Sequence, residues 1–131
     1  MNEEEARKFW ERSVSALRAA KRNLSIDPNT TANRAYYAAF YAAAALFTAE
    51  GATFKRHSVL ESLVHRDLVK PGRWSVELGA DYRFLRRLRS TGDYDVFAAV
   101  SLDDAKSAVD SALRILRAVC KEHPDLFGAP P

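Results

Sequence analysis

The segment from Arg89 to Tyr94 carries a guanidinium, a carboxylate and a phenol close together along the chain. On a helical pattern Arg89 shares a stripe with Leu78 and Leu85, so we expect its side chain to face inward. An inward arginine needs a carboxylate, a ligand or a partner subunit, whereas an arginine at a helix end can simply reach water. Arg89 is therefore a candidate for catalysis or ligand binding.

Asp93 and Tyr94 come directly after Gly92, which is expected to break the helix and let both side chains turn back toward Arg89. We therefore predict a charge-assisted pair between Arg89 and Asp93. We expect Tyr94, or a tyrosine of the apolar segment at residues 33–47, to be hydrogen-bonded beside this pair. The alternative is an aspartate in a turn and a tyrosine that only packs.

The segment from residue 33 to residue 47 is apolar on nearly every side, yet it carries Arg34 and several tyrosines, including Tyr37. A helix of this kind must be covered by neighbours, and its many alanines let those neighbours approach closely. Burying an unpartnered polar group costs about 1–3 kcal/mol, so these side chains need partners. Arg34 and Tyr37 join the candidate ligand-binding residues.

His57 is the histidine best placed to act as a base. It follows Lys55 and Arg56 at the start of an expected helix, where the helix dipole and both cations would keep the imidazole neutral. A neutral imidazole can accept a proton. The alternative is a histidine that caps or packs at a helix start.

Nine basic and four acidic residues lie between Lys55 and Gly92, although the net charge of the whole chain is only +3. Such a region is either a solvated basic face or a site for a phosphate-bearing ligand, of which RNA or a nucleotide is the most plausible.

These candidate residues require helices to position them. No segment shows convincing period-two alternation, so we predict an all-α fold: an antiparallel up-and-down four-helix bundle with an extra short helix. A single domain is expected over residues 1–131, with a core over about 3–123 and a frayed tail over 124–131. The expected helices cover about Glu3–Leu24, Thr31–Glu50, Ser58–Val69, Ser75–Ser90, and Ser101 to a stop at Pro124.

Several classes of protein are excluded. The longest uncharged apolar stretch, residues 35–49, has about 15 residues, too few for a membrane span. The N-terminus lacks the layout of a signal peptide, and the single cysteine, Cys120, fits a reducing cytoplasm. A glycine-rich phosphate loop, an HExxH motif and a cluster of cysteine and histidine are all missing. We therefore expect neither a cofactor nor a metal.

Three pieces of the chain together resemble the HEPN superfamily, in its small stand-alone branch. They are the segment that begins Arg34-Ala-Tyr-Tyr, the segment Lys55-Arg-His57-Ser-Val after Gly51, and Arg89-Ser-Thr-Gly-Asp93-Tyr94. The resemblance spans about residues 8–120. It implies an antiparallel helical bundle, in agreement with the pattern of apolar residues.

The resemblance also implies a function. Many HEPN proteins are ribonuclease toxins that act as homodimers, are neutralised by a nucleotidyltransferase, and use an arginine followed after four to six residues by a histidine. Arg89 is the equivalent arginine, but no histidine follows it at that spacing, and tyrosine, with a pKa of about 10, is a poor base near neutral pH. His57 or Tyr94 would have to replace that histidine.

Two hypotheses remain. In the first, the protein is a dimeric module that binds a nucleotide or RNA and works with a nucleotidyltransferase in a toxin–antitoxin or defence-type system. In the second, it is an active metal-independent ribonuclease that uses Arg89 with His57 or Tyr94. The missing histidine favours the first, in which the polar pocket is lined by Arg34, Tyr37, His57, Arg89, Asp93 and Tyr94.

Overall fold

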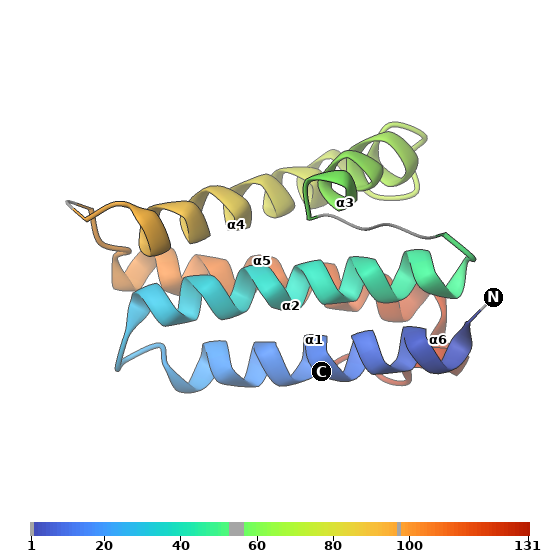
Figure 1. The fold of residues 1–131 in the computed structure, drawn as a ribbon, viewed down its shortest axis with the longest axis horizontal. Coiled ribbons are helices and arrows are strands. Elements are labelled where there is room, and N and C mark those ends of the chain that lie inside the picture. The colour runs from blue at the N-terminus through green and yellow to red at the C-terminus, as the bar shows by residue number, and fades with distance from the viewer. Residues whose placement is uncertain (1, 53–56, 97) are drawn as a thin grey trace.

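Four long helices form the body of the molecule (Figure 1). A computed structural model of the chain describes residues 2–52, 57–96 and 98–131, with the side chains of residues 57 and 58 outside the description. Consecutive long helices run in opposite directions, with α2 packed against α1, α4 and α5. The predicted all-α, up-and-down bundle is confirmed. The long helices are α1 (Glu3–Arg22), α2 (Pro28–Ala49), α4 (Val76–Tyr94) and α5 (Leu102–Glu122).

The helix starts carry side-chain caps. Asp27 accepts a hydrogen bond from the backbone N–H of Asn29, and Pro28 occupies the first turn, where its fixed φ suits the helix. This cap starts α2 at Pro28, three residues before the predicted Thr31. Ser101, the predicted start of the last long helix, caps α5 by accepting a hydrogen bond from the N–H of Asp104.

Helix α2 is the centre of the core, and its alanines let α1 lie close. The Ser13 hydroxyl of α1 donates to the Ala38 carbonyl oxygen at 2.6 Å, and the Thr31 hydroxyl of α2 donates to the Ala20 carbonyl oxygen at 2.8 Å. Both hydroxyls are buried, so these bonds satisfy polar groups that would otherwise be stranded between the two helices. This close packing holds the first half of α2, which carries the candidate site, in a fixed position.

Helix α4 continues through Gly92 and ends at Tyr94, so the predicted break at Gly92 is wrong. A Cβ on Gly92 would lie 3.2 Å from Cγ2 of Val100 and 3.5 Å from Oδ1 of Asn29. That amide oxygen accepts a hydrogen bond from the Val100 N–H at 2.9 Å. Glycine therefore serves close packing between α4, the start of α2 and the chain before α5.

The single short helix predicted over Ser58–Val69 is two elements, α3 (His57–Leu63) and the π-helix η1 (Val64–Val69). The wider turn of η1 is seen in the hydrogen bond from the Lys70 N–H to the His65 carbonyl oxygen, five residues back. Figure 1 shows both elements at the end of the bundle where α4 begins.

The chain after α5 is ordered further than predicted. Residues Pro124–Phe127 form the short helix α6, and Phe127 is buried against Trp10, with ring centroids 5.1 Å apart. Burial of this aromatic ring corrects the prediction of a tail frayed from residue 124. Among the described helices, none has both the length and the apolar composition needed to cross a bilayer.

Candidate functional site

Arg89 faces inward from the penultimate turn of α4, as its sequence stripe predicted. Its Nε lies 3.2 Å from Oδ2 of Asp93, one turn later, and the two side chains are 20% and 25% exposed. The Nε–H does not point at that oxygen well enough to count as a hydrogen bond. The contact is thus an ion pair defined by distance, and it forms because α4 continues through Gly92 and brings residues 89 and 93 onto one face.

Two phenols also bind the Arg89 guanidinium. Its Nη2 donates to the hydroxyl oxygens of Tyr37, from α2, and of Tyr94, from its own helix, each at 3.2 Å. The guanidinium carbon lies 5.2 Å, 5.4 Å and 5.6 Å from the ring centroids of Tyr36, Tyr37 and Tyr94. Such distances allow cation–π attraction in addition to the hydrogen bonds.

Asn33 links the two arginines of the site, and sequence reasoning missed it. Its Nδ2 donates to Oδ2 of Asp93 at 2.9 Å, while its Oδ1 accepts from Nε of Arg34 at 2.9 Å. Arg34 in turn lies over the ring of Tyr37, 5.0 Å from its centroid. The available signal in the sequence was an amide side chain one position before Arg34, in a helix that is mostly apolar. We call the following residues the Arg89 cluster: Asn33, Arg34, Tyr36, Tyr37, Arg89, Asp93 and Tyr94.

The Arg89 cluster is buried on one side and open on the other. Tyr36 is 3% exposed, and burial raises the pKa of its phenol despite the opposing charge of Arg89. Tyr94 is 71% exposed, and a cavity of about 370 Å³ borders Asp93 and Tyr94. The Arg89 Nη1 donates to none of the described residues, so its N–H groups are left for an oxyanion.

The structure does not place the His57 side chain, because that side chain lies outside the described part of the chain. The backbone of His57 begins α3, toward the start of α4, whereas Arg89 belongs to the last turns of that helix (Figure 1). The role of His57 stays a prediction. The site residues that the structure does bring together are Arg34, Tyr37, Arg89, Asp93 and Tyr94.

An arginine followed after four to six residues by a histidine does occur elsewhere in the chain, although not at Arg89, and sequence reasoning overlooked it. Five residues separate Arg117 from His123 at the end of α5. Six positions along an α-helix turn a side chain by about 240°, so the two residues point to different faces. His123 instead lies against Glu50, with Nε2 and Oε2 3.0 Å apart.

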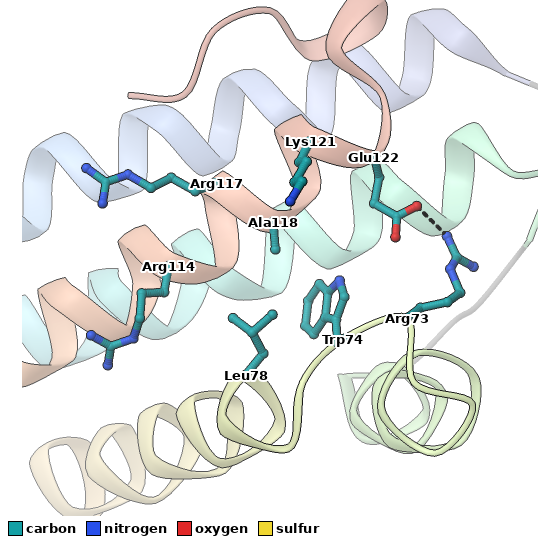
Figure 2. A pocket seen from close by; sticks show the side chains of 8 residues that line it. All are labelled: Arg73, Trp74, Leu78, Arg114, Arg117, Ala118, Lys121 and Glu122. Atoms are coloured by element: carbon teal, nitrogen blue, oxygen red, sulfur yellow. Dashed lines mark hydrogen bonds and ion pairs between the residues drawn. The ribbon is translucent and has the colours of Figure 1, made fainter.

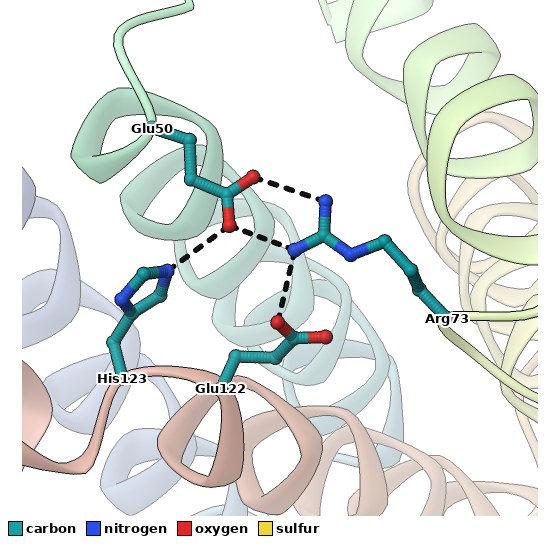
Figure 3. A network of polar contacts seen from close by, with 4 residues as sticks. All are labelled: Glu50, Arg73, Glu122 and His123. Atoms are coloured by element: carbon teal, nitrogen blue, oxygen red, sulfur yellow. Dashed lines mark hydrogen bonds and ion pairs between the residues drawn. The ribbon is translucent and has the colours of Figure 1, made fainter.

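A second polar network lies at the opposite end of α2 (Figure 3). Arg73 donates two hydrogen bonds to Glu50, at 3.1 Å and 2.7 Å, and one to Glu122 at 2.9 Å. Burial alone would raise the pKa of Glu50, but the hydrogen bonds from Arg73 and His123 outweigh it and lower that pKa. The network ties the ends of α2 and α5 to the loop before α4.

This network also contains side chains that can ligate a metal. Glu50, Glu122 and His123 offer ligand atoms within 4.8 Å of one another. Arg73 lies between the two carboxylates, and the guanidinium supplies the positive charge that they require (Figure 3). We therefore assign the network a structural role.

The chain is a small helical domain that carries the Arg89 cluster, and its residues match the model of a known family. Residues 6–123 match the family model of the HEPN domain, so the chain belongs to the HEPN domain family. The resemblance found in the sequence is confirmed.

Two relatives are similar over nearly their whole length. A UPF0332 protein of Thermotoga maritima is 34% identical over 129 residues, which cover 96% of this chain and 98% of the relative. The crystal structure of TT1696 from Thermus thermophilus superposes with a TM-score of 0.78, at 23% identity, over 90% of this chain and 98% of that one. At that identity the second likeness supports the fold alone.

Proposed function

We propose that the protein is a dimeric module that binds a nucleotide or RNA through the Arg89 cluster. The observation that carries this proposal is a guanidinium fixed by Asp93, Tyr37 and Tyr94, with one nitrogen, Nη1, that donates to no described residue. A preorganised arginine loses little conformational freedom when it binds a phosphate, and its Nη1 can donate to a phosphate oxygen.

The aromatic rings of the Arg89 cluster support a nucleic-acid ligand over a bare anion. Bases stack on tyrosine rings, and Tyr94 presents a largely exposed ring next to the arginine. Arg34, over the ring of Tyr37, adds a second positive charge within the same cluster. Cations interleaved with aromatic rings are typical of surfaces that bind single-stranded nucleic acid.

A homodimer would place two such clusters on one assembly. Val96, two residues after Tyr94, is 91% exposed, so an exposed apolar surface adjoins the site and leaves the Tyr94 ring to the ligand. Exposed apolar side chains of this size next to a polar site are common at subunit interfaces. We propose that this surface forms the contact between two copies around a two-fold axis.

The proposed partner is a nucleotidyltransferase, acting with this protein in a toxin–antitoxin or defence-type system. This part of the proposal rests on what membership of the HEPN family implies. Co-expression with the product of the adjacent reading frame, followed by size-exclusion chromatography of the pair, tests it. A stable complex with a nucleotidyltransferase supports the proposal, and a neighbour of another class that does not bind argues against it.

The binding proposal is tested by titrating fluorescently labelled single-stranded RNA and a labelled nucleotide with the protein at increasing salt. We expect affinity to fall steeply with salt, because each phosphate contact releases counterions. Affinity that is absent, or that is insensitive to salt, would overturn the proposal.

The second candidate function is a metal-independent ribonuclease. The observation in its favour is the Tyr94 hydroxyl, 3.2 Å from a nitrogen of Arg89 and on a largely exposed ring. Incubation of RNA with the protein in a chelator decides between the two functions. Loss of cutting in Tyr94→Phe assigns the phenol, loss in His57→Ala assigns the imidazole, and absence of cutting in the wild type leaves binding alone.

A further inference from the structure

A basic groove lies between α4 and α5, and no residue of the Arg89 cluster lines it (Figure 2). The groove encloses about 690 Å³, a volume typical of sites for small organic ligands. Leu78, which lines it, precedes Arg89 by eleven positions on α4, roughly 16 Å along the helix axis. The groove is therefore a different site from the Arg89 cluster.

The floor of the groove is apolar and held in place. Leu78 comes from the first turn of α4 and Trp74 from the loop before it, and Ala118 faces them from α5 (Figure 2). Trp74 is 2% exposed, and its backbone N–H donates to the Leu68 carbonyl oxygen at 2.8 Å. Arg73, the preceding residue, is bound to both Glu50 and Glu122 (Figure 3), so the groove exists before any ligand enters.

The walls carry four cations, which differ in whether they are paired. Arg73 is bound by its two glutamates, and Arg114 makes two hydrogen bonds to Asp81, at 2.9 Å and 2.8 Å. Arg117 and Lys121, one turn apart on α5, form neither a hydrogen bond nor an ion pair with any described residue. These two cations are therefore available to an anion.

A second unused group lies beside the apolar floor. The indole Nε1–H of Trp74 is buried and has no hydrogen-bond partner among the described residues. Figure 2 shows this nitrogen edge turned toward α5, on the side of Lys121. A buried donor without an acceptor is unfavourable, and because this nitrogen has almost no exposed surface, a ligand atom would reach it only if a side chain of the groove moved.

We propose that this groove binds a small organic anion, a phosphate monoester carried on an apolar body. Arg117 and Lys121 bind the phosphate, while the body packs on Trp74, Leu78 and Ala118. Figure 2 shows the Arg117 guanidinium extending away from the Lys121 ammonium, so the two exposed side chains must swing together to hold one phosphate. Their positions one helical turn apart allow this, and the apolar floor excludes water from one side of that contact.

The test is a titration of the full chain with phenyl phosphate and with hexyl phosphate, followed by nuclear magnetic resonance of the indole N–H groups. The chain has two tryptophans, and Trp10→Phe assigns their signals. We expect the Trp74 signal to shift with a saturable dependence on ligand while the Trp10 signal stays, because Trp10 packs against Phe127 in another part of the bundle. The two ligands distinguish an aromatic body from an alkyl body.

Each half of the ligand is tested separately. Inorganic phosphate lacks the apolar body and phenol lacks the charge, and we expect both to bind at least about tenfold more weakly than phenyl phosphate. Equal binding of inorganic phosphate would reduce the groove to a non-specific cationic surface, and equal binding of phenol would remove the role of the two cations. Either result overturns the proposal.

Variants locate the site. Arg117→Gln with Lys121→Gln should weaken binding at least about tenfold, and so should Ala118→Leu, which fills the groove without changing its charge. Lys106→Gln is the matched control, because Lys106 is an exposed cation on the same helix outside the groove. A saturable shift that is missing up to about 10 mM ligand, or an equal effect of Lys106→Gln, would contradict the proposal.

Discussion

Arg89 is held by one ion pair, two hydrogen bonds and three aromatic rings, while the described side chains around it leave its Nη1 unused. The phenols contribute no charge, so Asp93 supplies the one negative charge among the residues of the Arg89 cluster. Loss of Asp93 would leave the cluster with two uncompensated arginines, although Arg89 would keep both phenols.

The first prediction concerns the pair of Arg89 and Asp93. Both side chains are about one quarter exposed or less, so the pair lies between a surface ion pair and a buried one. We expect Asp93→Ala to lower the free energy of unfolding by about 1–2 kcal/mol, most of it the cost of stranding Arg89. Urea denaturation of both single variants and the double variant should give a coupling energy above about 0.5 kcal/mol. Additive effects would show that the two residues do not interact.

The second prediction concerns His65, whose Nδ1 faces Nη1 of Arg83 at 3.4 Å and whose Nε2 is buried without a described partner. Burial, and then the charge of Arg83, lower the pKa of His65 in the folded protein. As the pH falls through the ordinary histidine value of about 6.5, the unfolded chain therefore takes up a proton before the folded chain does, and stability drops. Below the lowered folded-state pKa the loss stops.

His65→Gln removes this proton uptake. Between about pH 7.5 and pH 5, on either side of the ordinary pKa, the stability of His65→Gln should fall less than that of the wild type in urea denaturation. An equal fall in both proteins would mean that His65 titrates alike in the folded and unfolded states.

Much of the Arg89 cluster could be predicted from residue types. An arginine on an apolar stripe and tyrosines in an alanine-rich helix both require partners, and this requirement correctly paired Arg89 with Asp93 and with a tyrosine of α2. The role of Asn33 could not be predicted, because its partners Asp93 and Arg34 meet only after α2 and α4 pack together. Spacing along the sequence does not predict contacts between residues of different helices that are far apart in the chain.

At the scale of elements, the existence of the helices was easier to predict than their ends. Apolar periodicity is repeated over many residues, whereas an end depends on a few local groups. Gly92 illustrates this difference: glycine usually interrupts a helix, but here it lets Asn29 and Val100 approach α4. The π-turns of η1 likewise carry no signal in apolar spacing, and the close approach of Val69 and His65, both in η1, to Gly79 is seen only in the folded chain.

The third prediction tests that packing at Gly79. Alanine in a helix interior is usually favoured over glycine by about 0.5–1 kcal/mol. A Cβ at this position, however, would lie 2.9 Å from Cγ2 and 3.3 Å from Cγ1 of Val69, a stiff β-branched side chain. We expect Gly79→Ala to destabilise the protein by about 1–2 kcal/mol in thermal or urea unfolding.

Val69→Ala provides the control for this prediction. In a Val69→Ala background the clash is removed, so Gly79→Ala should become neutral or stabilising. The same destabilisation in both backgrounds would show that contact with Val69 does not determine the choice of glycine.

At the scale of the whole molecule, the bundle has its two polar networks at opposite ends of α2. The Arg89 cluster lies near the start of α2, and the network of Arg73 lies at its end. An exposed apolar side chain adjoins each network, because Val96 lies two residues beyond Tyr94 and Val76 lies three residues beyond Arg73. We propose that copies of the chain associate through the end of α4 and the residues that follow it, because Val96, at 91%, is the more exposed of the two and lies beside the candidate site.

The fourth prediction concerns that association. Light scattering of the wild type should give about twice the chain mass of 14.7 kDa. Val96→Asp should shift the protein toward the monomer, because it places a charge in the proposed apolar contact. Val76→Asp is the matched control, since Val76 is also exposed, at 70%, but lies at the other end of α4. A monomeric wild type, or equal effects of the two variants, would contradict a dimer through this surface.

The fifth prediction tests the central claim, that Arg89 is the residue on which ligand binding depends. The measurement is the affinity of labelled single-stranded RNA, by fluorescence anisotropy at one fixed salt concentration, for the wild type, Arg89→Ala and Arg87→Ala. Arg87 is exposed on the outer face of the same helix, so both variants lose one positive charge from α4. We expect Arg89→Ala to weaken binding at least about tenfold and Arg87→Ala less than about threefold, because only Arg89 is preorganised beside stacking rings. Equal losses in the two variants would show that net charge alone attracts RNA, and would contradict the account of the Arg89 cluster as the binding site.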